Sequence, residues 1–383
     1  MLPYKVVIVA GEESGDRHAA EMVLELKSKS QSIDFSGIGG RHMQEAGVEL
    51  IADLTRFSAT GASEILRCLS VIYRAFKLIK AYLIAQKPDL LILVDYPEFN
   101  LRLAKFAKKQ NIRVLYYISP QIWAWKAGRI KTIKRCVDHM AVILPFEKTL
   151  YQNAGVPVTF VGHPLVKDIL VCANSDGTRL ALKLPLNRRV IAMLPGSRRN
   201  EVERHMPVLV ECAKRLLAQH SDLHFVIPIA GTLSTDLISS YLKAVNLPIT
   251  LIKGHAVEVA ACSDLVIVAS GTASLECALL EKPMCIIYKV SPLTYFLGAM
   301  LIKVQYFGLC NLLKNSMIVP ELLQYDCNAH ELTKLVNHLL LDPNTSTLMK
   351  KNLHDLKQSL STEYADSTIG ELVMAVCMSE KTH

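Results

Sequence analysis

The stretch that decides the fold is Leu194-Pro-Gly-Ser-Arg-Arg-Asn-Glu-Val-Glu203. It continues Arg189-Val-Ile-Ala-Met-Leu194, an apolar run typical of a buried parallel strand. A Pro-Gly pair ends the strand, a polar residue can cap the helix that follows, and two glutamates lie where a helix N-terminus favours acidic groups. Backbone N–H groups at such an end bind anions, and an arginine adds contacts to phosphate oxygens. We therefore predict a diphosphate site at Gly196, Ser197 and Arg198; a capped turn with solvated arginines is the alternative.

A second strand, loop and helix follow the same plan in Asp264-Leu-Val-Ile-Val-Ala-Ser-Gly-Thr-Ala-Ser-Leu-Glu276. The loop residues are Ser270, Gly271, Thr272 and Ala273. Their amides and hydroxyls gather at a positive helix end. Glu276 lies one turn further on, where its carboxylate could accept both hydroxyls of a ribose; the alternative is a capping-box glutamate. Neither loop has the Gly-x-x-x-x-Gly-Lys-Ser/Thr or Gly-x-Gly-x-x-Gly pattern, which argues against an ordinary ATPase or dinucleotide dehydrogenase.

The composition predicts a globular protein of two domains. A chain of 383 residues exceeds the roughly 100 to 200 residues of a typical single core, and 51% apolar with 20% charged residues is ordinary for globular proteins. No apolar run is long enough to span a bilayer and the N-terminus has the pattern of a strand, so we expect neither a membrane span nor a signal peptide. Ten cysteines without a Cys-x-x-Cys pair are typical of a reduced cytosolic protein, and neither zinc nor disulfides are expected.

The net charge of +8 predicts an anionic partner. The basic residues are spread along the chain without a helix-turn-helix, zinc-finger or RNA-binding signature, so nucleic acid is not expected. An anionic membrane face or a phosphorylated substrate fits the local patterns better.

Apolar strands alternate with helical segments along the chain, which is the pattern of parallel sheets with helices on both faces. We predict an α/β protein of two doubly wound, Rossmann-like domains, residues 1–165 and 166–383, facing each other across a cleft. The helical residues 329–379 could pack back on the first domain. Ligands of such sheets bind beyond the carboxyl ends of the strands, which assigns the nucleotide to the second domain. The predicted strands are residues 4–10, 34–38, 90–95, 112–117, 139–144, 158–161, 189–194, 223–228, 249–252, 264–269 and 284–288.

Acidic residues follow two predicted strands of the first domain. Ala10-Gly-Glu-Glu-Ser-Gly-Asp16 offers Glu12 and Asp16 in a tight turn, with a solvated acidic turn as the alternative. Asp95 ends the apolar run Leu90-Leu-Ile-Leu-Val94. A carboxylate at the end of a buried strand loses solvation unless it is paired or used, so we predict a functional role for Asp95; capping of the next helix is the alternative.

Two further segments suggest contact with a sugar or a lipid. Ile118-Ser-Pro-Gln-Ile-Trp-Ala-Trp125 holds both tryptophans and precedes a basic run. Aromatic faces beside cations suit a sugar or a phosphorylated head group, or equally a plain interface. Residues 64–83 predict an amphipathic helix with basic residues largely off its apolar stripe, which could lie in a membrane surface or pack on its sheet. The candidate contacts in the first segment are Trp123, Trp125, Lys126 and Arg129.

Seven motifs in series make the chain resemble the bacterial lipid-A-disaccharide synthases over residues 5 to about 325. They are Ala-Gly-Glu-Glu-Ser-Gly-Asp, Asp-Tyr-Pro-Glu-Phe-Asn, Ser-Pro-Gln-Ile-Trp-Ala-Trp, Leu-Pro-Phe-Glu147, Phe-Val-Gly-His-Pro164, Leu-Pro-Gly-Ser-Arg and Ser-Gly-Thr-Ala-Ser-Leu-Glu. The resemblance implies an inverting glycosyltransferase of the GT-B architecture. Such an enzyme joins UDP-2,3-diacylglucosamine to 2,3-diacylglucosamine 1-phosphate (lipid X) in a β-1,6 linkage and releases UDP. It implies a cytoplasmic protein, peripheral on the anionic cytoplasmic face of the inner membrane, and is compatible with a homodimer.

Position by position, the resemblance also implies site residues. Asp95 corresponds to the essential aspartate and Glu12 to the glycine-loop glutamate, which form the catalytic pair. Arg198 corresponds to the phosphate-binding arginine, Glu276 to the ribose-binding glutamate, and Asn311 to the asparagine of a late Asn-Leu-Leu motif in nucleotide binding. The family's apolar membrane patch corresponds to Ile65, Leu66, Leu69 and Ile72.

The chain departs from the family at two positions. Glu98 replaces an aspartate, which changes reach and not charge, and Ser63 is polar where an apolar residue is expected at the membrane patch. No Asp-x-Asp motif is present, so no metal and no other cofactor are expected. The alternatives are a UDP-N-acetylglucosamine 2-epimerase-like enzyme and a non-catalytic UDP-sugar or lipid-binding protein. The basic amphipathic helix argues against the first, and the pair of carboxylates argues against the second.

Overall fold

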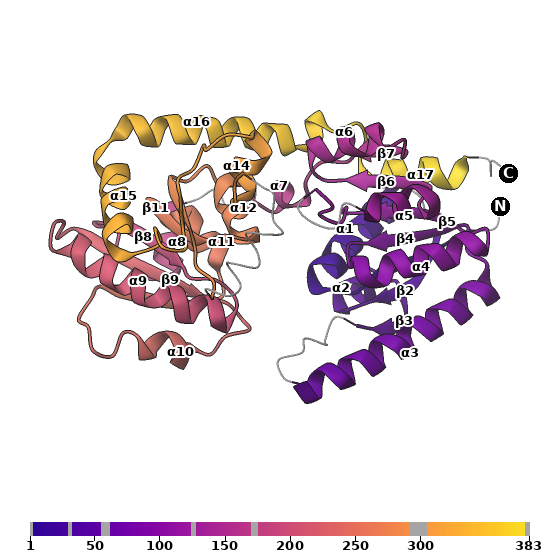
Figure 1. Cartoon of the computed structure of the whole chain (residues 1–383), viewed down its shortest axis with the longest axis horizontal. Coiled ribbons are helices and arrows are strands. Elements are labelled where there is room, and N and C mark those ends of the chain that lie inside the picture. The colour runs from indigo at the N-terminus through magenta and orange to yellow at the C-terminus, as the bar shows by residue number, and fades with distance from the viewer. Residues whose placement is uncertain are drawn as a thin grey trace. The chain divides into compact units, whose positions relative to one another are not determined.

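The computed structural model describes residues 3–29, 33–54, 62–123, 128–169, 175–291 and 305–379, apart from the side chains of residues 62–69, 168, 175 and 176. The chain forms two compact units (Figure 1). The first joins Met1–Pro164 with Leu360–His383, and the second is Leu165–Ser359. Each unit contains a parallel sheet, which confirms the predicted α/β class.

The sheet of the first unit has the strand order β3-β2-β1-β4-β5-β6-β7, and all neighbouring strands are parallel. The order reverses between β1 and β4, so the loops after these two strands leave the sheet side by side. The strands are β1 (Tyr4–Ala10), β2 (Ile33–Gly39), β3 (Glu49–Asp53), β4 (Leu90–Val94), β5 (Arg113–Tyr117), β6 (His139–Val142) and β7 (Val158–Phe160).

Helices cover both faces of this sheet because its strands are apolar on both sides. Val7 and Val9 belong to one buried cluster, with residues of α3, α4, α5 and α6, whereas Val6 and Ile8 belong to another, with residues of α1, α2 and α17. The helices are α1 (Glu13–Lys29), α2 (Arg41–Glu45), α3 (Ala62–Gln86), α4 (Pro97–Lys109), α5 (Arg129–Cys136), α6 (Pro145–Asn153) and α17 (Ile369–Met378), with a 3-10 turn at Thr362–Tyr364.

The sheet of the second unit has the order β10-β9-β8-β11-β12-β13, also parallel, and reverses between β8 and β11. Its strands are β8 (Arg189–Leu194), β9 (Leu223–Ile229), β10 (Ile249–Lys253), β11 (Leu265–Ala269), β12 (Met284–Tyr288) and β13 (Glu321–Leu323). The helices from Pro164 to Leu360 are α7 (Pro164–Ile169), α8 (Ser175–Ala181), α9 (Arg199–Leu217), α10 (Thr235–Ser240), α11 (Ala256–Cys262), α12 (Thr272–Leu279), α14 (Leu309–Lys314), α15 (Ala329–Leu341) and α16 (Pro343–Leu360).

The sequence analysis missed two strands, β3 and β13. Each lies at an edge of its sheet, and neither contains a fully buried residue. Both therefore lack the buried apolar run that marks most of the predicted strands. Pairing with β2 and with β12, which is a tertiary contact, extends these short segments.

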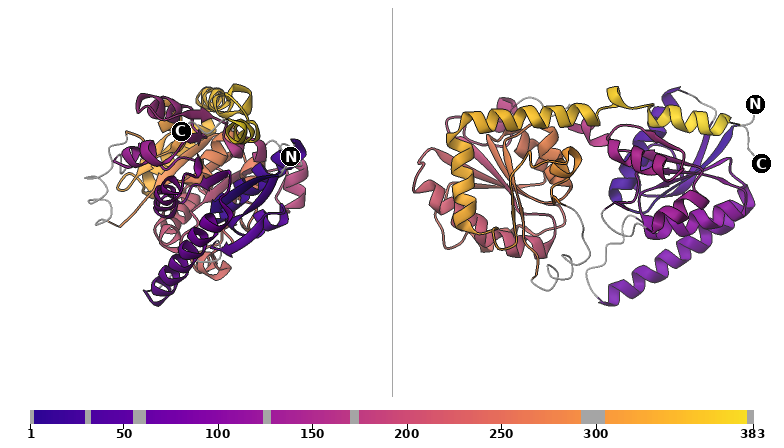
Figure 2. Two further views of the ribbon diagram at one scale, coloured as in Figure 1. Left: turned by 90° about the vertical axis from the view of Figure 1, so that its right-hand side faces the viewer. Right: turned by 45° about the horizontal axis from the view of Figure 1, so that its top comes forward.

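Helix α3 contains the segment predicted to be amphipathic, and its N-terminal turns extend past the other helices of the first unit (Figure 2). Ile79 and Leu83 are fully buried, and Ile72 and Phe76 pack against the same core. From Ile72 onward the predicted stripe therefore packs on the sheet, and Ile72 is not a free membrane contact. The side chains of Ile65, Leu66 and Leu69 lie outside the described residues. Among the described helices, none is long and apolar enough to cross a membrane.

Candidate functional site

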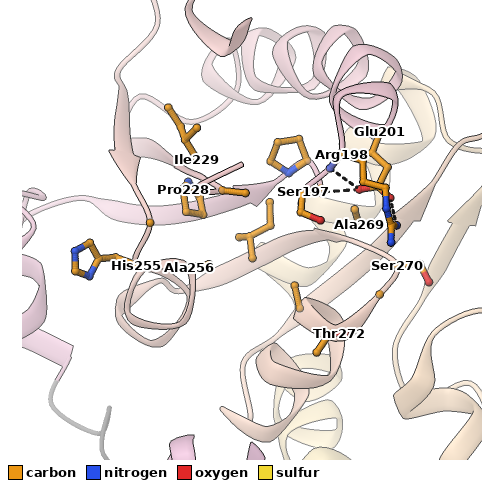
Figure 3. Close-up of a pocket in the computed structure, with 18 residues that line it drawn as sticks. Ser197, Arg198, Glu201, Pro228, Ile229, His255, Ala256, Ala269, Ser270 and Thr272 are labelled. Carbon is orange, nitrogen blue, oxygen red and sulfur yellow. Dashed lines mark hydrogen bonds and ion pairs between the residues drawn. The ribbon is translucent and has the colours of Figure 1, made fainter. Parts of the chain in front are cut away.

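A cavity of about 510 Å³ opens at the carboxyl ends of the strands of the second sheet (Figure 3). It lies where the strand order reverses, between β8 and β11, which is the usual ligand position in open α/β sheets. The residues of both predicted loops line it: Gly196, Ser197, Arg198, Ser270, Gly271, Thr272 and Ala273. The opposite wall includes Pro228, Ile229, His255 and Ala256. The structure thus brings together two loops that are far apart in the sequence.

A carboxylate of the protein occupies the predicted phosphate position. Glu201 Oε2 accepts hydrogen bonds from the backbone N–H groups of Ser197 at 3.1 Å and Arg198 at 3.2 Å. Its Oε1 pairs with the Arg198 guanidinium at 2.8 Å (Figure 3). The Arg198 side chain is 81% exposed, and two backbone amides at a helix start beside an accessible guanidinium are the groups that bind phosphate oxygens. Glu201 was not singled out as a site residue because a glutamate in the first helical turn is ordinary capping-box chemistry.

Glycine is required at two positions of the cavity wall. Gly196 has φ +116°, and a Cβ there would lie 2.4 Å from Glu201 Oε2. Gly271 has φ +151° with open space around it, so its backbone conformation and not crowding requires glycine. These two residues let both loops expose their amides to the cavity.

His205 supports the first loop and was also missed by the sequence analysis. It is fully buried, and its Nε2 accepts a hydrogen bond from the Lys289 N–H at 3.0 Å. The proton is therefore on Nδ1, which donates to the Pro195 carbonyl at 2.7 Å. Burial lowers the pKa of His205 and keeps it neutral. A lone histidine on an amphipathic helix gives no sequence signal for this role.

Two predicted nucleotide-binding residues do not line the cavity. Glu276 is half-buried on α12, one turn beyond Ala273. Asn311 is fully buried on α14, and its Nδ2 donates to Val319 and Glu321 oxygens, each at 2.6 Å. Its Oδ1 accepts two backbone N–H bonds, at 2.8 and 2.9 Å. Because these bonds use the capacity of the amide, Asn311 organises the surrounding chain in this structure, and its part in nucleotide binding stays a prediction.

Asp95 follows β4 at the reversal point of the first sheet. Its φ of +46° and that of Tyr96, +45°, are in the left-handed region, which costs non-glycine residues free energy and is concentrated at functional sites. The buried Asn100 side chain donates to the Asp95 carbonyl at 2.7 Å, and the Tyr116 hydroxyl donates to the same oxygen at 2.6 Å. Burial and then the nearby Glu12 charge raise the pKa of Asp95 to about 6.

The two acids predicted after β1, Glu12 in the loop and Asp16 in the first turn of α1, have different roles. Glu12 is exposed and close enough to Asp95 to raise its pKa. The loops are in contact, since a Cβ at Gly11 would lie 2.2 Å from the Tyr96 ring. Asp16 is fully buried and accepts hydrogen bonds from backbone N–H groups at the start of α2, the shortest at 2.6 Å. It caps α2 and is not part of the acidic site.

A second buried acid lies beside this centre. Glu147, in the Leu-Pro-Phe-Glu motif, is 1% exposed, and its Oε1 accepts the Trp123 indole N–H at 3.2 Å. Its other oxygen has no partner among the described residues. Burial, with a smaller contribution from Asp95, raises the pKa of Glu147 to about 8. Trp123 therefore has a structural anchor as well as a potential contact surface.

Of the predicted acceptor contacts after Trp123, Arg129 is ion-paired with Glu98, and its side chain is only 13% exposed. The Arg129 charge thus balances the glutamate that departs from the family pattern. Trp125 and Lys126 lie outside the described residues. Within the described ranges, no group of three or more His, Cys, Asp and Glu side chains is arranged to hold a metal ion.

The two sites have complementary chemistry. The carboxylate of Asp95, with its raised pKa, can accept a proton near neutral pH. The cavity of the second unit offers backbone amides and a guanidinium to negative charge. A proton acceptor thus lies at the strand reversal of the first sheet and an anion site at that of the second, on two Rossmann-like units.

Solved structures share this two-unit fold. A putative UDP-N-acetylglucosamine 2-epimerase from Listeria monocytogenes matches with a TM-score of 0.66 and 13% identity, over 98% of this chain and 96% of that one. The calicheamicin glycosyltransferase CalG4 matches with a TM-score of 0.60 and 13% identity, over 98% of both chains. At such identity the likeness establishes the fold alone, a GT-B-like fold shared by epimerases and glycosyltransferases.

Sequence comparison identifies the family. Residues 6–371 match the family described as lipid-A-disaccharide synthetase. Lipid-A-disaccharide synthase 1 of Legionella pneumophila is 58% identical over 372 residues, 97% of each chain, and the lipid-A-disaccharide synthase of Geobacter sulfurreducens is 41% identical over 371 residues, again 97% of each. The chain belongs to the lipid-A-disaccharide synthase family of glycosyltransferases, which act in lipid A biosynthesis.

Proposed function

We propose that this protein transfers the diacylglucosamine of UDP-2,3-diacylglucosamine to the 6-hydroxyl of 2,3-diacylglucosamine 1-phosphate and releases UDP. The observation that carries the proposal is the placement of Asp95, with its raised pKa, at one sheet reversal and of the anion cavity at the other, in a chain of this family. Membership of the family supplies the substrates, and the site chemistry supports the roles of the residues.

The proposed reaction is a single inverting displacement. Asp95 accepts the proton of the acceptor 6-hydroxyl while the oxygen of that hydroxyl attacks the anomeric carbon of the donor sugar. The bond from the anomeric carbon to the UDP oxygen breaks. The diphosphate leaves with an added negative charge. Arg198 and the amides of the two loops stabilise that charge, so the proposal requires no metal ion. The charge of Glu12 raises the pKa of Asp95, and the proposal assigns Glu12 the role of strengthening Asp95 as a base.

The test is incubation of purified protein with both diacylated substrates, followed by mass spectrometry for the disaccharide and by quantification of UDP. Formation of both products in equal amounts supports the proposal, and the Asp95→Asn protein is the control for background hydrolysis. The fold also admits a UDP-N-acetylglucosamine 2-epimerase. Conversion of UDP-N-acetylglucosamine to its 2-epimer without disaccharide formation would favour that alternative.

Helix α3 supports a further part of the proposal, binding to an anionic membrane surface. Helical spacing places Tyr73, Lys77 and Ile84 on the side opposite the buried Ile79, and the two large apolar residues of this set are 70% and 52% exposed. Apolar contact and attraction of basic side chains to anionic lipid act together on such a face.

Co-sedimentation with anionic liposomes tests this part. We expect binding that weakens at high salt and that falls when Tyr73 and Ile84 are both changed to Ser. Leu341 and Leu348, which are 66% and 60% exposed in the second unit, provide a matched double Ser control. Equal loss in both variants, or no loss in either, would contradict a role for this face of α3.

A further inference from the structure

The turn at Phe307 and Gly308 is held by a glutamate that the reaction does not use. Glu321 lies on the edge strand β13, and its Oε2 accepts the Phe307 N–H at 2.9 Å while its Oε1 accepts the Gly308 N–H at 2.9 Å. Gly308 is the N-cap of α14 and has no side-chain cap of its own. The carboxylate therefore holds the two backbone amides that lead into this helix, that of the N-cap residue and that of the residue before it.

Asn311 completes the arrangement. Its Nδ2 donates to Glu321 Oε1 at 2.6 Å, so both carboxylate oxygens are engaged by three donors. A side chain at position 308 would be crowded, because a Cβ there would lie 3.0 Å from the same Oε1. These three donors are satisfied only when both terminal atoms of side chain 321 are hydrogen-bond acceptors. A glutamine at 321 has nearly the same shape, but its NH₂ would face a donor on one side.

A hydrogen bond from Ser270 links the turn at Phe307 and Gly308 to the cavity wall. The Phe307 carbonyl accepts the Ser270 Oγ–H at 3.0 Å, and the Ser270 backbone N–H donates to the Ile287 carbonyl, also at 3.0 Å. Both donors of Ser270 are therefore used inside the protein. The next residues, Gly271 and Thr272, line the cavity and begin α12. The position of the Phe307 carbonyl thus fixes the point at which this loop leaves β11.

We infer that Glu321 and Asn311 are positioning residues for the second loop of the nucleotide cavity, and that they act through the hydrogen bond from Ser270 to the Phe307 carbonyl. Ser270 anchors this loop and does not donate its hydroxyl hydrogen to a phosphate, although the sequence placed it among the ligand-binding hydroxyls. The inference rests on the proposed function, because the ligand whose affinity it controls is UDP.

A double-mutant cycle measured by calorimetry with UDP tests the inference. One intramolecular hydrogen bond contributes about 0.5 to 1.5 kcal/mol, so Ser270→Ala is expected to weaken UDP binding by roughly 2- to 12-fold. Glu321→Gln is expected to weaken it by about as much or more. The double variant is expected to bind no more weakly than Glu321→Gln alone, since both changes remove the same restraint. Ser270→Thr, which keeps the hydroxyl, is expected to lose less UDP affinity than Ser270→Ala.

Controls separate this inference from the proposed function. Glu211→Gln is the matched control, because Glu211 pairs with Lys214 and Arg215 on α9 and does not line the cavity. Absence of UDP binding by the wild type contradicts the proposed function itself. Unchanged UDP affinity in folded Glu321→Gln, or additive losses in the double variant, overturns the inference alone. If Glu321→Gln does not fold, equal UDP affinities of Ser270→Ala and the wild type overturn it.

Discussion

Replacing Asp95 by asparagine should abolish turnover and stabilise the protein at the same time. The side chain is nearly isosteric, and asparagine tolerates the left-handed backbone at φ +46°. Asparagine cannot accept the proton of the acceptor hydroxyl, so we expect turnover to fall by about 100-fold or more. Stability should rise because the half-buried carboxylate, close to the Glu12 charge, has a free energy cost in the wild type.

The size of that cost follows from the pKa of Asp95, which is raised from 3.8 to about 6 by burial and by Glu12. A folded-state pKa above the unfolded value means that the proton stabilises the fold. That contribution is complete below about pH 4 and is lost as the pH rises through 6. The free energy difference is at most about 3 kcal/mol above pH 7 and below about 1 kcal/mol at pH 4. For a domain of this size it corresponds to a rise in Tm of several degrees, roughly 2 to 4 °C per kcal/mol.

Differential scanning calorimetry at pH 7.5 and pH 4, with turnover assayed on the same preparations, measures both effects. The expected result is a higher Tm for Asp95→Asn at pH 7.5 and little difference at pH 4. A Tm that falls equally at both pH values would mean that Asp95 supports the fold through its hydrogen bonds and not through its charge. Turnover near the wild-type rate would place the base elsewhere, with Glu12 as the first alternative.

Four further predictions concern the two sites. Arg198→Ala should weaken UDP binding by roughly 10- to 150-fold, the loss of one charge-assisted contact, and unchanged affinity in calorimetry would remove Arg198 from the phosphate site. Glu201→Gln should strengthen UDP binding several-fold, because the carboxylate that occupies the loop amides loses its charge; weaker binding by the folded variant would mean that Glu201 serves the loop as a cap alone. Glu12→Gln should move the acidic limb of the pH–rate profile below the wild-type midpoint near 6, because the Glu12 charge raises the pKa of Asp95; an unmoved limb would separate the two residues. Turnover should be unchanged after dialysis against EDTA, and recovery of a lost rate by added Mg²⁺ would refute the metal-free reaction.

Local sequence determined the parts of the fold that depend on continuous apolar runs. The eleven predicted strands correspond to observed ones within a few residues, because most strands covered on both faces are apolar along nearly their whole length. The loops after β8 and β11 were predicted for a related reason. A strand that ends in Pro-Gly or Ser-Gly before a helix start carries its geometry in its own residues, and the parallel order of the strands then brings both loops to one edge.

The tertiary structure alone decided what the polar side chains do. Asp16 and Asp95 are both acids near strand ends, yet one caps α2 and the other keeps a raised pKa. Asn311 has the sequence context of a ligand-binding residue, but its partners come from the segment that leads into β13 and from the first residue of that strand. The physical reason is the range of the forces. Backbone propensity and apolar periodicity act between residues close in sequence, whereas the partners and solvation of a polar group are set by chain segments that meet only after folding.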